Sequence, residues 1–150
     1  MRISSRFTIA VHVLMCIETF KHDYKVTSEF LASSVNVNPV VIRRLLQQLK
    51  RAGIVRVARG SGGADTARSL DQITMLDVYH AVECVDKGKL FHVHENPNSR
   101  CPVGRNIHGV LNTRLENIQQ VMEREMESVT LRDILADMQE RIQEEDVRKN

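Results

Sequence analysis

Apolar residues return at helical spacing in several segments of the chain, with short polar breaks between them. In residues 5 to about 20 they recur every three or four positions, which places them on one face of a helix. The pattern therefore predicts an opening amphipathic helix that packs against a core through a single stripe. The stripe consists of Phe7, Ala10, Val11, Leu14 and Met15.

The next apolar pattern indicates two short helices joined by a tight turn. Thr27 is a good N-cap for the first, and Glu29 adds negative charge to its first turn, where the helix dipole favours it. Asn38 can cap the second helix, and Pro39 suits its first position because no N–H is needed there. We expect this helix to end at about residue 52, since Gly53 favours a helix end.

The second helix has two contrasting faces. Its inward face is apolar and consists of Ile42, Leu45, Leu46 and Leu49. Its outward face carries cations and no acid; it consists of Val40, Arg43, Arg44, Gln47, Lys50 and Arg51. Residues 54–58 and 64–70 then predict two strands around a glycine turn that begins with Arg59. Together these elements predict a winged helix-turn-helix, whose second helix enters the DNA major groove.

The second half of the chain predicts three more helices. Thr74 and Asp77 have the spacing of a capping box, so a helix starts there and ends near residues 84–88. Residues 89–103 form an irregular loop. Residues 104 to about 128 form a long helix of roughly 35 Å, and residues 129–134 repeat the capping signature before a final helix.

The apolar stripe of the long helix is too extended for a compact winged helix to cover, so we expect it to pack against a second copy of the chain. Two copies of a helix-turn-helix match a palindromic operator. The expected dimer interface consists of Ile107, Val110, Leu111, Leu115, Ile118, Val121 and Met122, and the stripe continues to Met126.

Charge is distributed unevenly along the chain. The 150 residues contain 21 Lys and Arg and 19 Asp and Glu, a formal net charge of +2. Residues 1–68, however, hold 11 basic and 4 acidic side chains, which leaves the remainder acidic. This asymmetry indicates that only the first half meets a polyanion. We expect a cytoplasmic protein without a membrane span or signal peptide, and its three cysteines fit reduced thiols better than a disulfide framework.

The order of these motifs resembles the Rrf2 family of bacterial winged-helix regulators, which includes the IscR, NsrR and CymR types. The resemblance rests on the helix-turn-helix, the 59–63 turn, the run at residues 73–78 and the Cys101-Pro102 start of the long helix. It implies a mainly α fold with a small β wing: a DNA-binding domain at 1–84, a sensor or linker loop at 85–103 and dimerisation helices at 104–150. It also implies a homodimeric transcription factor, often one that senses iron–sulfur clusters, nitric oxide or redox state.

The resemblance places base reading at the start of the second helix of the motif, with Arg59 at the wing tip. Arg43 or Arg44 can donate two hydrogen bonds to a guanine, and the sequence does not decide which of them does. Arg2 and Arg6 either contact phosphates or are simply solvated. The residues expected at double-stranded DNA are Arg2, Arg6, Thr27, Val40, Val41, Arg43, Arg44, Gln47, Lys50, Arg59 and Ser61.

Two positions depart from the family pattern. Many members have an aromatic residue after the wing glycines, where this chain has Ala64. Cluster-binding members place three cysteines in the loop before the long helix, and only Cys101 is present there, so we expect no iron–sulfur cluster. The sequence leaves a bound metal as an alternative, because thiolate and imidazole are ligands for transition metals. A redox or small-molecule effector is a further alternative. The candidate sensor residues are Cys101, His92, His94 and His108.

Three functions follow from these patterns. The first is a homodimeric, sequence-specific transcriptional regulator that acts as a repressor. The second is a thiol- or metal-responsive regulator with Cys101 as its trigger. The third is a winged-helix protein-interaction module that no longer binds DNA. No nucleophile–base pair or pair of carboxylates stands out, and the glycine turn lacks the Gly-Lys-Ser/Thr ending of a nucleotide-binding loop, so we do not expect an enzyme.

Overall fold

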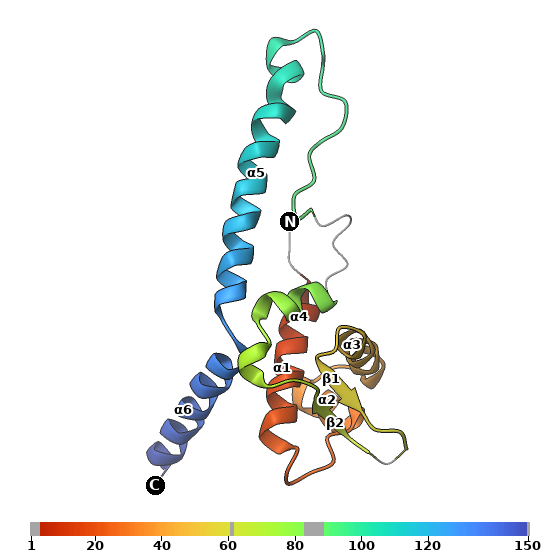
Figure 1. The fold of residues 1–150 in the computed structure, drawn as a ribbon, viewed down its shortest axis with the longest axis vertical. Coiled ribbons are helices and arrows are strands. Elements are labelled where there is room, and N and C mark those ends of the chain that lie inside the picture. Colours follow the sequence, from red (N-terminus) through yellow and green to blue (C-terminus); the bar gives the residue numbers. More distant parts are fainter. Residues whose placement is uncertain (1–3, 61, 83–88, 150) are drawn as a thin grey trace.

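The computed structural model describes residues 4–60, 62–82 and 89–149, and consists of a winged-helix body with a long helical arm (Figure 1). The mainly helical fold with a small β wing is confirmed. The elements are α1 (Ser5–Phe20), α2 (Ser28–Val35), α3 (Pro39–Arg51), β1 (Val55–Val57), β2 (Ala64–Thr66), the 3-10 helix η1 (Leu70–Gln72), α4 (Met75–Val82), α5 (Pro102–Ser128) and α6 (Leu131–Lys149).

Helix α1 lies at the centre of the body and is buried on more than one side. The predicted stripe contributes Phe7, Ala10, Leu14 and Met15 to the core, but Val13 and Ile17 are buried as well, at 0% exposure. The stripe was too narrow because α1 contacts α2, α3, α4, β2 and α6, which surround it. A sequence pattern identifies the most apolar face of a helix, whereas the number of neighbours decides how much of it is covered.

The helix-turn-helix begins and ends at the predicted capping residues. The Thr27 side chain accepts a hydrogen bond from the backbone N–H of Phe30, and the Asn38 side chain accepts one from Val40. Gly53, with φ of +71°, reverses the chain after α3. The helices therefore have the predicted boundaries to within a residue.

The strands of the wing are shorter than predicted, and the second is held against the α1–α2 loop. Strands β1 and β2 pair antiparallel, with Val57 opposite Ala64. The backbone N–H of Ala64 donates to Val26 at 2.9 Å, and a Cβ added to Gly63 would lie 2.7 Å from the Val26 nitrogen. Only a residue without a side chain allows this approach, and the small Ala64 that follows it is itself buried. The loop backbone therefore leaves no room for a side chain at Gly63, and it holds Ala64 in place through the hydrogen bond to Val26.

The arm is joined to the body by two capping boxes that lie side by side. Thr74 and Asp77 exchange hydrogen bonds of 3.0 and 3.1 Å at the start of α4. Thr130 and Asp133 exchange hydrogen bonds of 2.8 and 3.3 Å at the start of α6. Between them, Thr74 and Thr130 form an antiparallel β-bridge, and Leu131 donates its N–H to the carbonyl of Ile73 at 2.9 Å. We call this contact the α4–α6 joint. It fixes the end of α5 and the start of α6 relative to the winged helix.

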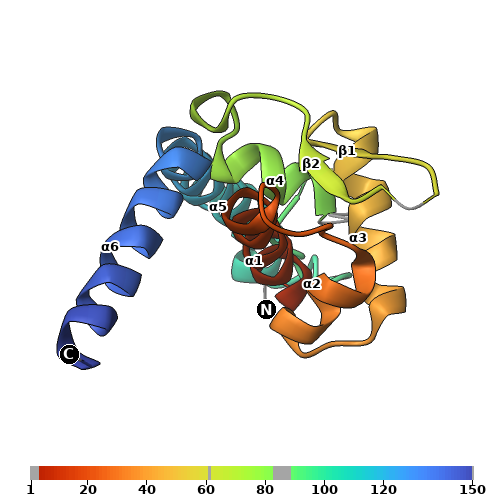
Figure 2. The ribbon, with the colours of Figure 1, turned by 90° about the horizontal axis from the view of Figure 1, so that it is seen from below.

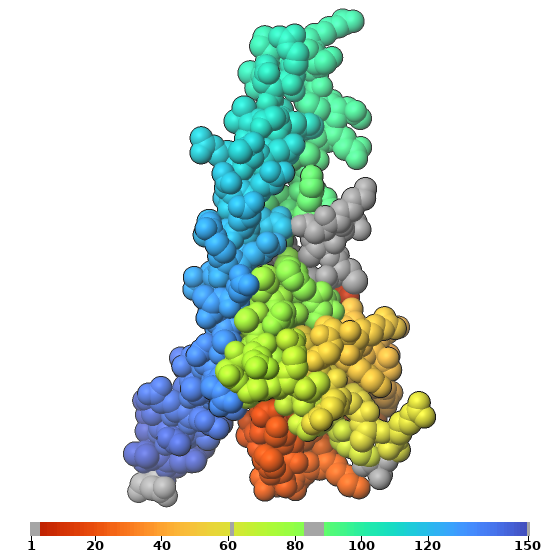
Figure 3. Space-filling model, in the orientation of Figure 1, coloured from red at the N-terminus to blue at the C-terminus, as the bar shows by residue number. Residues whose placement is uncertain are grey.

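Helix α5 extends away from the body, and the space-filling view shows it as a column above the winged helix (Figure 3). It begins at Pro102, two residues before the predicted start, and none of its residues is buried. Helix α6 projects on the side opposite the wing (Figure 2). No helix among the described residues has the length and apolar character needed to cross a membrane.

Leu131 is the only fully buried side chain of α6, with 0% exposure, and lies in the α4–α6 joint. We predict that Leu131→Ala lowers the free energy of unfolding by about 2–4 kcal/mol, because it removes buried methyl groups and leaves a cavity. Urea denaturation followed by circular dichroism measures the change. The control Val147→Ala, at a residue that is 76% exposed, should change stability by less than about 0.5 kcal/mol. Equal effects of the two variants would show that the joint contributes nothing.

Candidate nucleic-acid interface

Helix α3 turns its apolar side into the core and its basic side outward. Ile42, Leu45 and Leu49 are at most 1% exposed, so the opposite face must point to solvent. Val40, Arg43, Arg44, Gln47, Lys50 and Arg51 are all exposed, as predicted for the outward face. Val41, in contrast, is half-buried and packs against the core, so the structure leaves it less available to a base than its neighbour Val40.

The outward face of α3 borders a groove shared with the start of α2 and the wing. The groove has a volume of about 440 Å³ and is open to solvent. Its polar lining comes from three parts of the fold: Thr27, Ser28 and Glu29 at the start of α2, Arg43, Gln47 and Lys50 of α3, and Arg59 of the wing. Cations outnumber acids in this lining, which gives it the charge that a phosphate backbone attracts.

Arg43 is paired with an acid that belongs to a different helix. Its Nη2 donates to Glu29 Oε1 at 2.5 Å and its Nε donates to Ser28 Oγ at 3.3 Å. The Ser28 hydroxyl also donates to the other Glu29 oxygen, at 3.1 Å. The acid-free outward face of α3 is therefore correct for α3 itself but incomplete for the surface, because α2 adds a carboxylate. Within the described residues, Arg44 makes no hydrogen bond or ion pair.

The surroundings of Glu29 keep its carboxylate ionised. Its own backbone N–H, then the Arg43 guanidinium and the Ser28 hydroxyl, lower the pKa of the Glu29 side chain below the usual value. The sequence by itself indicates only a dipole role for Glu29 in the first turn of α2. Glu29 lies on α2 and Arg43 on α3, and the turn between the two helices interrupts any helical spacing, so only the crossing of α2 over α3 brings them together.

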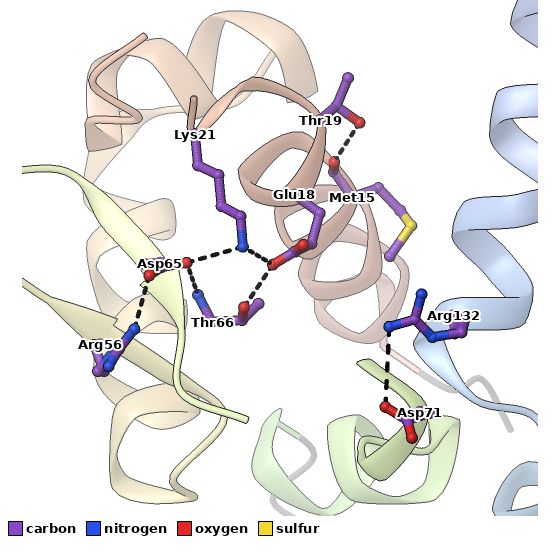
Figure 4. A network of polar contacts seen from close by, with 9 residues as sticks. All are labelled: Met15, Glu18, Thr19, Lys21, Arg56, Asp65, Thr66, Asp71 and Arg132. Atoms are coloured by element: carbon purple, nitrogen blue, oxygen red, sulfur yellow. Dashed lines mark hydrogen bonds and ion pairs between the residues drawn. The ribbon is translucent and has the colours of Figure 1, made fainter. Parts of the chain in front are cut away.

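A polar network fastens the wing to the end of α1 (Figure 4). Lys21 Nζ contacts Glu18 at 2.9 Å and Asp65 at 3.3 Å, and Asp65 also pairs with Arg56 at 2.8 Å across the hairpin. The Thr66 hydroxyl donates to the same Glu18 oxygen that accepts from Lys21. No local pattern in the sequence indicates these partners, because they lie on three separate elements.

The network shifts the pKa values of its charged groups. Burial by itself raises the pKa of the Asp65 carboxyl, but the hydrogen bonds from Arg56 and Lys21 and the charge of Lys21 lower it overall. Burial likewise lowers the pKa of Lys21, and the hydrogen bonds and charges of Glu18 and Asp65 outweigh this and raise it. Both shifts mean that the charged forms are stabilised in the folded state.

The remaining predicted DNA contacts divide into three groups. Arg6, at the start of α1, and Arg59, at the wing tip, are exposed. Thr27 is half-buried, and its hydroxyl is used as the cap of α2. Arg2 and Ser61 lie outside the described residues, as does the predicted helix end at 84–88. Contact of each residue with DNA stays a prediction.

The candidate sensor residues lie around the far end of α5. Cys101 is exposed and precedes the first turn of α5, while the rings of His94 and His108 meet edge to face at 5.0 Å. The Nε2 atom of His108 is buried, and no described residue makes a hydrogen bond to it. Among the described residues, no three His, Cys, Asp or Glu side chains are arranged to hold a metal. A sensor role for Cys101 and for His92, which is exposed, stays a prediction.

A basic helix of a helix-turn-helix, flanked by a two-stranded wing, defines the winged-helix class of DNA-binding folds. Comparison with known proteins identifies the family. The family model described as "Rrf2: Iron-dependent Transcriptional regulator" matches residues 3–137. The chain belongs to the Rrf2 family of transcriptional regulators, and it is not an enzyme.

Individual relatives agree with this assignment. The chain is 42% identical over 133 residues, 89% of its own length and 96% of the other, to the "Putative HTH-type transcriptional regulator YwnA" of Bacillus subtilis (strain 168). A crystal structure of "a putative DNA binding protein" is 37% identical, with a TM-score of 0.68 over 87% of this chain and 99% of the other. IscR of T. potens, 19% identical, shares the fold with a TM-score of 0.67 over 92% of this chain and 88% of the other.

Asp65 gives the wing network a pH dependence that can be measured. Because its folded pKa is lowered, its stabilising effect is fully present above the unfolded value of about 3.9 and is lost as the pH falls through the folded value. We predict that Asp65→Asn costs up to about 1 kcal/mol at pH 6, a value limited by solvent screening of this half-exposed group. Urea midpoints at pH 6, 4.5 and 3 should show the difference from wild type shrinking as the pH falls.

The exposed Asp137 of α6 supplies the matched control for this experiment. Asp137→Asn removes the same charge without touching the network and should give a urea midpoint close to wild type at pH 6. A difference for Asp65→Asn that stayed constant down to pH 3 would contradict the role of its ionised form.

Proposed function

We propose that this chain is a homodimeric, sequence-specific DNA-binding regulator that represses transcription from palindromic operators in the cytoplasm. The observation that carries the proposal is the exposed basic face of α3, which has its apolar side fixed in the core and the wing groove beside it. Exposed Lys50 and Arg59 are suited to phosphates, which would make the affinity strongly dependent on salt. A repressor of this kind would act by occupying DNA that the polymerase needs.

The division of the α5 stripe supports the homodimer. Leu111 and Leu115 are half-buried, and Met122 packs against the core of the same chain. On the adjacent side, Val103, Val110, Ile118 and Val121 are 55–68% exposed. A row of large apolar side chains on one side of a protruding helix is costly to leave in water. A second α5 packed against this row would bury it and present two copies of α3 to a palindrome.

The base-reading role of α3 can be tested by removing its two exposed arginines together. Arg43→Ala/Arg44→Ala should lower the preference for the operator over scrambled DNA by at least about 5- to 150-fold, because a bidentate guanine contact is worth about 1–3 kcal/mol. The operator is first selected from random duplexes with the wild-type protein, and affinities follow from fluorescence anisotropy. Arg141→Ala/Arg148→Ala removes the same charge from exposed positions of α6 and should keep the preference. Sequence preference that survived the α3 variant would contradict the proposal.

The dimer can be tested with an acid in the exposed row. Val110→Glu/Ile118→Glu should give a monomer in analytical ultracentrifugation, since two such charges cannot be buried in an apolar contact without a large penalty. Its far-ultraviolet circular dichroism should stay close to wild type, because both side chains are solvent-exposed in the single chain. Gln120→Glu, at another exposed position of α5, is the control and should leave the dimer intact. A wild-type protein that sediments as a monomer would overturn the proposed assembly.

A further inference from the structure

The two arginines at the start of α3 are held differently. Arg43 lines the groove and is bound by Glu29 and Ser28, whereas Arg44 is exposed and makes no hydrogen bond or ion pair within the described part of the chain. An arginine that is already fixed loses less side-chain freedom when it binds a target of defined geometry. A free arginine suits a phosphate, which accepts hydrogen bonds from many directions.

The contacts of Arg43 occupy one edge of its guanidinium. Nε donates to Ser28 Oγ, and one N–H of Nη2 donates to Glu29 Oε1, so both bonds use the edge nearest the side-chain stem. These two bonds do not use the second N–H of Nη2 or the two N–H groups of Nη1. The outer edge therefore keeps one N–H from each terminal nitrogen, in the parallel arrangement that matches O6 and N7 of guanine.

Glu29 also stands in a position that is unfavourable for DNA affinity alone. It is an exposed, ionised carboxylate in a groove whose other charged side chains are cations. A negative charge here repels phosphates and weakens binding to every sequence. Exposed ion pairs such as this one add little to the stability of the fold. The pair is therefore better explained by what it does to Arg43 than by affinity or stability.

We propose that Glu29, with Ser28, is a specificity-positioning residue that holds Arg43 so that its free outer edge reads a guanine, while Arg44 contacts phosphate. This inference rests on the proposed function, because it requires sequence-specific DNA binding. It assigns the reading role to one of two arginines that the sequence left equivalent. It also makes α2, which carries Glu29, a part of the reading surface through α3.

The test measures base discrimination rather than affinity alone. Duplexes are selected from a random-sequence library with the wild-type protein. Dissociation constants are then measured for the selected duplex, its single-base variants and a scrambled duplex. Arg43→Ala should reduce discrimination at one guanine of each half-site by about 5- to 150-fold. Glu29→Ala should reduce it at the same guanine by about 3- to 10-fold and bind the scrambled duplex as tightly as wild type or more tightly.

Two further variants separate positioning from other roles of the carboxylate. Glu29→Gln keeps an oxygen acceptor for Arg43 and should retain more of the guanine preference than Glu29→Ala. In the Arg43→Ala background, Glu29→Ala should cause no further loss, because it acts through Arg43. The control Glu116→Ala, at an exposed acid of α5, removes the same charge and should leave the preference unchanged.

The outcomes distinguish this inference from the function on which it rests. A wild-type protein that enriches no sequence would overturn the proposed function and this inference together. A wild-type protein that enriches an operator, with Glu29→Ala keeping the full guanine preference, would overturn this inference alone. An additional loss from Glu29→Ala in the Arg43→Ala background would mean that the carboxylate contacts a base itself, and would also overturn it.

Discussion

The structure depends on the burial of one side of α3 against the body. Ile42, Leu45 and Leu49 are almost completely removed from water, and a helix of 13 residues cannot rotate without exposing them. Apolar burial contributes about 25 cal/mol per Å². A rotation of α3 would expose several of these side chains at once and lose the free energy of their burial. The basic face is therefore held outward by packing on its opposite side, and no contact on the basic face itself is needed to keep it there.

Packed helices and backbone hydrogen bonds also connect the reading surface with the arm. The α4–α6 joint pairs backbone groups of residues 73–75 with those of residues 129–131, and each side of the pairing is the start of a capped helix. Because α4 also contacts α1, α3 and α5, a change in the direction of α5 would be transmitted to the body through rigid elements. Half-site spacing in a dimer depends on this geometry. The loop at residues 89–101, which reaches α5 through the bond from Leu90 to Gln119, lies beside the same arm.

Acidic residues play two different structural roles on the basic half of the chain. Asp65 and Glu18 hold cations that belong to the scaffold, Lys21 and Arg56, and so fix the wing relative to α1. Glu29 holds a cation on the exposed face of α3. Lys50, Arg51 and Arg59 stay exposed on the same half, which keeps it basic. The net charge of this surface therefore says less about it than knowing which cations are paired with an acid and which are not.

The sequence alone determined the elements that depend on neighbours a few residues apart. Thr27, Asn38, Gly53 and the Thr74–Asp77 box act over one turn of chain, so their caps were predictable, and so were the amphipathic faces of α3. Only the tertiary structure decided how many sides of α1 are buried, that Val41 packs inward, and that Glu29 meets Arg43. These features depend on how elements cross. The angle at which two helices cross is set by the packing of their whole faces, and the spacing of residues within one helix does not predict it.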